Sequence, residues 1–159
     1  MKIGVMSDTH LREVTGKLIW IVEDLFKETD MILHAGDVGS QTVLTYLEAM
    51  GVKAVRGNLD PFEVARSLPS KRLIEVGKLK IGLIHGWGSY TGLDKKIRPE
   101  FDQIDCLVFG HSHHPTNENI GNELYFNPGS ATGVPRSSKN SVGLLHLNEA
   151  VRGEIITFD

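Results

Sequence analysis

Residues 3–10 read Ile-Gly-Val-Met-Ser-Asp-Thr-His, a short apolar run that ends in a polar cluster. The run predicts a β-strand, and the apolar residues within 18–26 then recur at helical spacing. The alternation continues with a strand candidate at residues 31–33, a helical stripe at 43–50 and a strand at 52–55. A β-α-β-α-β order of this kind indicates parallel strands joined by crossover helices.

The second half of the chain changes from this alternation to paired strands. Residues 72–76 and 79–84 flank Gly77-Lys78, a two-residue turn typical of a β-hairpin. Further strands are expected at residues 106–109, 124–126, 142–147 and 154–158, and a short helix at 91–98. We therefore expect an α/β chain with two mixed sheets packed together and helices outside. No repeat or linker-like stretch interrupts the sequence, so we expect one domain over residues 1–159.

The composition is that of a folded, slightly acidic protein. The 159 residues include 17 Lys and Arg against 20 Asp and Glu, so the formal net charge is −3. This balance argues against broad electrostatic capture of nucleic acid or anionic lipid. The start of the chain turns polar too soon for a signal peptide, no apolar run approaches the ~18 residues of a membrane span, and a single cysteine, Cys106, excludes an internal disulfide. We expect a cytoplasmic protein that has no membrane partner, and the charge disfavours a nucleic-acid partner.

Five polar clusters directly follow five of the predicted strands. The carboxyl ends of parallel strands meet at one edge of a sheet, where α/β proteins bind ligands. Glycines beside the polar residues allow sharp turns and a close approach of the backbone to whatever the side chains bind. The clusters are Asp8-Thr9-His10, Gly36-Asp37, Gly57-Asn58-Leu59-Asp60, His85-Gly86 and Gly110-His111-Ser112-His113.

These clusters offer oxygen and imidazole donors and no thiolate. The candidate donors are Asp8, His10, Asp37, Asn58, His85, His111 and His113. Such a set suits Mn²⁺, Fe²⁺, Co²⁺, Ni²⁺ or Zn²⁺. Seven donors are too many for one tetrahedral site, but they suffice for two ions about 3.5–4 Å apart that share a carboxylate, as in phosphoryl hydrolysis. The sequence therefore predicts a dinuclear site for divalent metal ions.

The order DxH, GD, GNxD, a single His after a strand, and GHSH resembles the calcineurin-like metallophosphoesterase superfamily. Asn127-Pro128-Gly129-Ser130 followed by Pro135-Arg136 is similar to its small prokaryotic phosphodiesterase branch, which also resembles the retromer subunit Vps29. The resemblance implies a four-layer α/β/β/α sandwich of two mixed sheets flanked by helices. It also implies a small phosphate-ester substrate and assembly as a homodimer or homotetramer.

The resemblance also implies a role for each donor. Asp8, His10 and His113 would hold the first ion, Asn58, His85 and His111 the second, and Asp37 would bridge them. We expect two divalent ions, with Mn²⁺ favoured, and in-line attack on phosphorus by a hydroxide that bridges them. Asp37, Asn58 and His111 are the residues expected to carry catalysis.

One departure from the family pattern is Leu59. Many members carry a histidine there, thought to protonate the leaving group, and general acid catalysis typically contributes about 10²–10⁴-fold. We therefore expect activated aryl esters or diesters to be better substrates than simple alkyl monoesters. Asp60 has two interpretations: a turn with Pro61, or a carboxylate that orients the loop of Asn58.

Two other functions stay open beside a phosphodiesterase. A non-catalytic, metal-binding interaction scaffold is suggested by the resemblance to Vps29, because fold alone does not fix function. A nuclease is compatible with the metal chemistry, but the charge of −3 and the absence of a basic stripe disfavour it.

Four features outside the donor set also give expectations. His34 is expected to be a strand histidine with satisfied ring nitrogens, and Trp20 a core residue. Trp87, beside His85, could wall the pocket and stack on a base or aryl group. The basic run at residues 95–98 is expected to be a solvated helix face.

Overall fold

The first of two five-stranded sheets is built around the N-terminal strand. The computed structural model describes residues 1–133 and 139–159, so Pro135-Arg136 of the expected family pattern lies outside the described residues. The strands are β1 (Lys2–Met6), β2 (Met31–His34), β3 (Lys53–Ala54), β9 (Asn140–Leu147) and β10 (Val151–Phe158). They lie in the order β10–β9–β1–β2–β3, with β1, β2 and β3 parallel and β9 and β10 antiparallel. The expected parallel β-α-β-α-β unit is confirmed.

The second sheet contains the expected hairpin and one strand that the sequence did not reveal. Its strands are β4 (Lys71–Val76), β5 (Leu79–Ile84), β6 (Cys106–Val108), β7 (Thr116–Ile120) and β8 (Glu123–Asn127). Their order is β4–β5–β6–β8–β7, with β5, β6 and β8 parallel. Strand β7 has no apolar alternation because it is an edge strand that is exposed over most of its length.

Short helices connect the strands. They are α1 (Gly16–Ile19), the π-helix η1 (Trp20–Leu25), α2 (Gln41–Ala49), α3 (Phe62–Ser67), α4 (Leu93–Ile97) and the 3₁₀ turn η2 (Arg98–Glu100). Ser40 caps α2, its hydroxyl accepting the backbone N–H of Val43. Trp20, expected in the core, is 40% exposed, because Leu18 and Ile21 on either side of it face the sheet instead.

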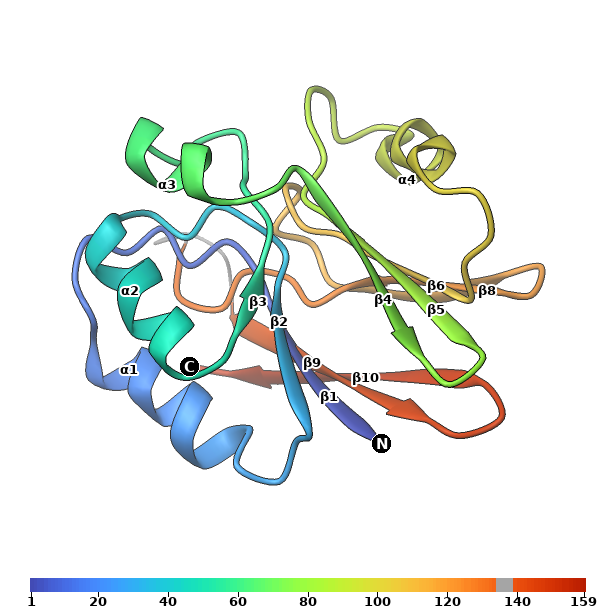
Figure 1. Ribbon diagram of the computed structural model, residues 1–159, viewed down its shortest axis with the longest axis horizontal. Coiled ribbons are helices and arrows are strands. Elements are labelled where there is room, and N and C mark those ends of the chain that lie inside the picture. Colours follow the sequence, from blue (N-terminus) through green and yellow to red (C-terminus); the bar gives the residue numbers. More distant parts are fainter. Residues whose placement is uncertain (134–138) are drawn as a thin grey trace.

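Three apolar clusters define the layers. Val5 and Leu83 belong to the cluster between the two sheets, and Leu44 belongs to the cluster that α1, η1, α2 and α3 form on the first sheet. Ile97 of α4 packs on the outer face of the second sheet. Helices therefore cover both outer faces, as Figure 1 shows. The expected four-layer α/β/β/α sandwich is confirmed.

Strand register brings the polar clusters to one place. Met6 of β1 pairs with His34 of β2, and His34 pairs with Ala54 of β3, so the three parallel strands end close together. In the second sheet, Leu83 of β5 pairs with Val108 of β6 in the same way. Within the part of the chain described here, no helix combines the length and hydropathy needed to cross a membrane.

Candidate metal centre

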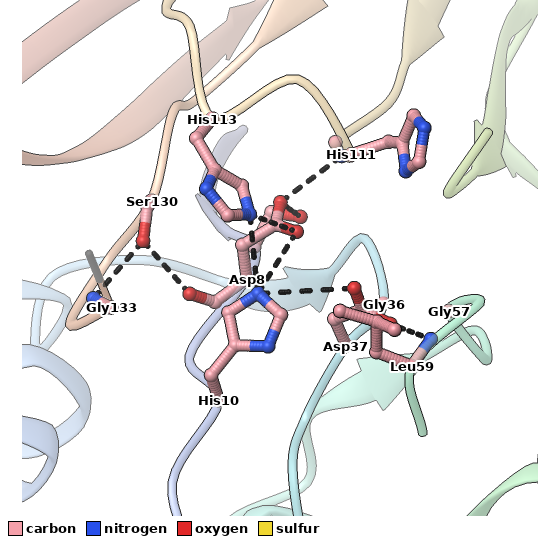
Figure 2. A network of polar contacts seen from close by, with 12 residues as sticks. Asp8, His10, Gly36, Asp37, Gly57, Leu59, His111, His113, Ser130 and Gly133 are labelled. Carbon is pink, nitrogen blue, oxygen red and sulfur yellow. Dashed lines mark hydrogen bonds and ion pairs between the residues drawn. The ribbon is translucent and has the colours of Figure 1, made fainter. Parts of the chain in front are cut away.

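All seven expected donors lie in loops that follow β1, β2, β3, β5 and β6. Contacts of 3.0–3.8 Å between their polar atoms connect the whole set, from His113 through Asp8, His10, Asp37 and His85 to Asn58 and His111. Figure 2 shows how Asp8, His10 and His113 point toward one another, with Asp37 beside them. The structure therefore brings together every residue that the sequence selected.

The first group consists of Asp8, His10 and His113. Nε2 of His113 lies 3.1 Å from Oδ1 of Asp8, and Nε2 of His10 lies 3.5 Å from the same oxygen. This oxygen is buried and accepts no hydrogen bond from residues 1–133 or 139–159, whereas Oδ2 of Asp8 accepts from Ser7 and from the backbone N–H of His111. Metal–ligand bonds of about 2.1 Å separate neighbouring ligand atoms by about 3.0–3.4 Å. The spacing and the orphaned oxygen therefore fit a cation.

The second group consists of Asn58, His85 and His111. Nδ1–H of His85 donates to the carbonyl of Ala35 at 2.7 Å, and Nε2–H of His111 donates to the carbonyl of Gly88 at 2.8 Å. Because carbonyls only accept, the other nitrogen of each ring, in the neutral form that binds a metal ion, directs its lone pair toward Oδ1 of Asn58, at 3.0 and 3.1 Å. Backbone acceptors commonly orient metal-binding histidines in this way.

Asp37 lies between the two groups. Its Oδ2 is 3.2 Å from Nε2 of His85 and 3.8 Å from Nε2 of His10, while Oδ1 accepts the backbone N–H of Leu59 at 2.8 Å. Asp8 also approaches the second group, with Oδ1 3.9 Å from Nε2 of His85. Asp8, Asp37 and His85 thus form a second constellation with metal-like spacing, which shares Asp8 with the first.

The backbone is strained at these positions. Within residues 1–133 and 139–159, only five non-glycine residues have positive φ, and all five are expected donors. They are Asp8 (φ 54°), His10 (49°), Asp37 (56°), His111 (70°) and His113 (58°). The left-handed conformation costs roughly 1–2 kcal/mol for each L-residue that adopts it. Strain concentrated at one cluster is typical of a functional site.

Two glycines permit close approaches inside the cluster. A Cβ at Gly57 would lie 2.0 Å from Oδ1 of Asp37, and a Cβ at Gly110 would lie 2.0 Å from Oγ of Ser7. A side chain at either position would displace the loop that carries Asn58 or the loop that carries His111. The glycines of GNxD and GHSH therefore allow packing of one loop against the next.

The charges of the cluster shift the pKa values of its members. Burial raises the pKa of Asp8, but His10 and His113 outweigh it and hold that pKa far below its usual range. Burial lowers the pKa of His85, yet Asp37 and Asp8 raise it above the usual value, and the pKa of His10 is raised by Asp8. Two buried carboxylates thus attract positive charge, which protons or a metal ion can supply.

Asp60 connects two of the donor loops. Its Oδ2 accepts the backbone N–H of Gly57 at 2.8 Å and that of Asp37 at 3.1 Å, and its Oδ1 accepts the N–H of Gly39 at 3.0 Å. Of the two interpretations left open by the sequence, these contacts support the carboxylate that orients the loop of Asn58.

The side chain of His34 connects the loop that carries Asp8 with the loop that carries Asp37. Its Nδ1 accepts the backbone N–H of Gly36 at 3.1 Å, so Nε2–H donates to Oγ1 of Thr9 at 3.0 Å. Both ring nitrogens are satisfied, as expected. Burial lowers the pKa of His34 to about 4.

The basic run at residues 95–98 is not a simple solvated face. Nζ of Lys96 donates to the carbonyl of Trp87 and lies over its indole ring, 5.7 Å from the centroid. Arg98 pairs with Glu123 through contacts of 2.5 and 2.6 Å. The expectation of a solvated face is therefore wrong for Lys96 and Arg98, because their partners lie on separate segments of the chain.

A hollow of about 390 Å³ adjoins the second group and is lined by Arg56, Asn58, His85 and Trp87, among others. Trp87 therefore walls a pocket, as expected. The Leu59 side chain is 67% exposed. An alkyl group thus stands where many family members carry an imidazole.

Such a sandwich, with Asp, Asn and His donors gathered at its strand ends, defines a class of metal-dependent phosphoester hydrolases. Residues 1–150 match the model of the calcineurin-like phosphoesterase superfamily domain. A probable metallophosphoesterase of Methanothermobacter thermautotrophicus is 37% identical, over 98% of this chain and 92% of that protein. The chain belongs to the calcineurin-like phosphoesterase superfamily.

Solved structures support the same fold. An archaeal phosphodiesterase superposes with a TM-score of 0.78 at 23% identity, over 99% of this chain and 100% of that one. Vps29 from Entamoeba histolytica in complex with Zn²⁺ superposes with a TM-score of 0.72 at 25% identity, over the full length of both chains. The fold is therefore shared with a phosphodiesterase and with Vps29.

Proposed function

We propose that this protein is a phosphodiesterase dependent on two divalent metal ions. Asp8, His10 and His113 would hold one ion, Asn58, His85 and His111 the other, and Asp37 would lie between them. The proposal rests above all on the facing acceptor atoms. In the neutral form that binds metal, the rings of His85 and His111 direct lone pairs at Oδ1 of Asn58, while Oδ1 of Asp8 accepts no hydrogen bond from the residues that the structure describes. Acceptors that face one another at 3.0–3.1 Å are stabilised by a cation placed among them.

The donor set fits the ions expected from the sequence. Carboxylate, amide and imidazole donors without thiolate suit Mn²⁺, which we favour, as well as Fe²⁺, Co²⁺, Ni²⁺ and Zn²⁺. Bound ions of this kind supply a water of lowered pKa as the nucleophile and neutralise charge that develops on the phosphoryl oxygens. The chain holds and orients these groups through Ala35, Gly88 and Asp60.

The exposed Leu59 favours particular substrates. Because its side chain cannot donate a proton, an alkoxide leaving group receives no help from this position. Diesters and activated aryl esters, which leave as weaker bases, are therefore the proposed substrates, ahead of alkyl monoesters. Location in the cytoplasm, a small phosphate-ester substrate and assembly as a homodimer or homotetramer stay predictions.

Metal reconstitution tests the proposal. The protein is stripped with a chelator, reloaded with Mn²⁺, Ni²⁺, Co²⁺, Zn²⁺ or Mg²⁺, and assayed with bis-p-nitrophenyl phosphate and p-nitrophenyl phosphate. We expect turnover that depends on metal and is faster with the diester. Asp37→Asn should abolish it, whereas Asp102→Asn, at an exposed acid outside the donor loops, should not. Turnover that survives Asp37→Asn would contradict the assignment.

A second candidate is a non-catalytic scaffold that binds metal. The likeness to the Zn²⁺ complex of Vps29 supports it, but the retention of all seven donors favours the enzyme. Metal binding in the stripped and reloaded protein, combined with no turnover of either ester, would transfer the assignment to the scaffold. A nuclease is a third candidate, disfavoured by the net charge of −3.

A further inference from the structure

A second hollow lies beside the donor cluster, along the second sheet. It has a volume of about 560 Å³, within the range of sites for small organic ligands. Its apolar lining includes Tyr90, Phe109, Ile120 and Tyr125, which come from the loop after β5, the position directly after β6, the edge strand β7 and β8. We call this hollow the aromatic groove. Three of these four side chains are aromatic rings.

The aromatic groove adjoins the donor cluster through Tyr90. The Tyr90 ring packs edge-on against the His111 ring, with the centroids 5.1 Å apart. Ser112 and His114 also line the groove, and they alternate along the chain with the donors His111 and His113. The groove and the donors thus lie on opposite sides of the Tyr90–His111 contact, next to each other along the same loop.

The charge of the groove restricts what can occupy it. Asp94 and Glu118 contribute carboxylates to its lining, and the described part of the chain contributes no Lys or Arg to it. Such a lining repels a phosphate or carboxylate, and it accepts hydrogen bonds from N–H and O–H groups. The occupant that fits is an uncharged ring with hydrogen-bond donors.

Two of the lining residues are unusually exposed. The side chains of Tyr90 and Ile120 are 61% and 47% exposed, so neither is held by the core. Gly88 and Gly92 flank the Tyr90 segment, both with positive φ, so the loop presents the ring to solvent rather than burying it. An exposed aromatic ring at the mouth of a hollow is a natural stacking surface for a planar ligand.

We propose that the aromatic groove binds the organic arm of the phosphodiester that does not leave, and that this arm is a nucleoside. A nucleobase is planar and uncharged and stacks on aromatic rings, and the base and sugar carry the N–H and O–H donors that Asp94 and Glu118 can accept. This inference rests on the proposed phosphodiesterase function, because it assigns one arm of the substrate of that site.

Two diesters with the same leaving group test the groove. Methyl p-nitrophenyl phosphate and thymidine 5′-(p-nitrophenyl phosphate) both release nitrophenolate, so only the remaining arm differs between them. We expect kcat/KM to be at least about fivefold higher for the thymidine ester, the lower end of what stacking on one aromatic ring contributes. Tyr90→Ala should reduce this ratio by at least about fivefold, and Ile120→Ala should reduce it less.

A control variant separates the groove from general effects. Leu73 is another exposed apolar residue, 49% exposed on β4, and does not line the groove. Leu73→Ala should leave the ratio at the wild-type value. Equal kcat/KM for the two esters in the wild-type protein, or a ratio unchanged by both Tyr90→Ala and Ile120→Ala, would overturn the inference.

A binding measurement that needs no turnover separates the inference from the proposed function. Thymidine, which has no phosphate, is added to chelator-treated protein and observed by saturation-transfer difference NMR. We expect transfer to the base protons in wild-type protein and a clear loss in Tyr90→Ala. Thymidine binding without hydrolysis of either ester would retain the groove and refute the phosphodiesterase. Hydrolysis with neither thymidine binding nor preference for the thymidine ester would refute the groove alone.

Discussion

The carboxylate of Asp60 accepts the backbone N–H of Asp37 at 3.1 Å, which joins the loop after β3 to the loop after β2. The same carboxylate accepts the N–H groups of Gly57 and Gly39, so three backbone donors converge on one side chain. The two loops carry Asn58 and Asp37, both expected donors. Asp60 therefore sets the distance between parts of the proposed metal centre without belonging to it.

Replacement of Asp60 should weaken metal binding. Asp60→Asn retains the shape of the side chain, but its amide cannot accept all three N–H groups. We expect the affinity for Mn²⁺, measured by isothermal titration calorimetry, to fall about 10–100-fold, as for other groups that orient metal ligands. The free energy of unfolding of the metal-free protein should fall by about 1–3 kcal/mol. Asp24→Asn, at an exposed position of η1, is the matched control, and equal effects of the two substitutions would contradict this role.

The sequence predicts that the candidate donors lie together because their signal is local. Asp8 and His10 directly follow an apolar strand, and the ends of parallel strands meet at one edge of a sheet whatever the detailed packing. The same reasoning identified the layers, because alternating strands and helices of this kind allow few arrangements.

Features that depend on contacts between residues far apart in the chain could not be predicted from the sequence. Asp60 could not be separated from a turn residue, because Asp37 and Gly39 lie more than 20 residues earlier in the chain. Helix α3 was missed because its first residue, Phe62, is 76% exposed and Val64 is its one buried residue, which leaves no apolar stripe to detect. Strand β7 was missed for the same reason.

Lys96 should influence the metal centre from a distance. Its ammonium donates to the carbonyls of Trp87 and Ser89, on either side of the Gly88 carbonyl that orients His111. Without this contact, the loop holds the His111 ring less firmly. Lys96→Met should therefore weaken Mn²⁺ binding about tenfold in calorimetric titrations. Lys95→Met, the same change at the exposed neighbouring position, should leave Mn²⁺ affinity unchanged. Equal affinities in the two variants would refute a role for the Lys96 hydrogen bonds in metal binding.

His34 should make the metal-free protein less stable in acid. Its pKa is about 4 in the folded chain against an ordinary histidine value of 6.5, so between these pH values mainly the unfolded chain binds a proton there. Stability should therefore rise with pH over this window, by about 1.4 kcal/mol per unit from this group. Urea unfolding at pH 4.5 and 6.5 should show a flatter dependence for His34→Gln. His146→Gln, on β9, should retain the wild-type dependence, and a wild-type slope in His34→Gln would exclude this origin.

The strain at His10 should be visible in a pair of small substitutions. With φ at 49°, His10→Gly should exceed His10→Ala in free energy of unfolding by about 1 kcal/mol in the metal-free protein, because glycine adopts this conformation without a Cβ penalty. At Thr45, in the middle of α2, the order should be the opposite. Thr45→Ala should exceed Thr45→Gly in free energy of unfolding by about 1 kcal/mol. The same order at both positions in denaturant titrations would show that the backbone at His10 stores no strain.

Metal binding should release protons, and more of them at lower pH. The pKa values of His10 and His85 are raised in the metal-free protein, so at pH 6.5 both rings carry protons that a metal ion must displace. Affinity for Mn²⁺ should therefore increase as pH rises through these raised values. Calorimetric titrations in two buffers of different ionisation enthalpy count the protons released, and we expect more of them at pH 6.5 than at pH 8.5. Release that does not change between these pH values would mean that His10 and His85 are not ligands, because a ring that keeps its proton cannot coordinate through that nitrogen.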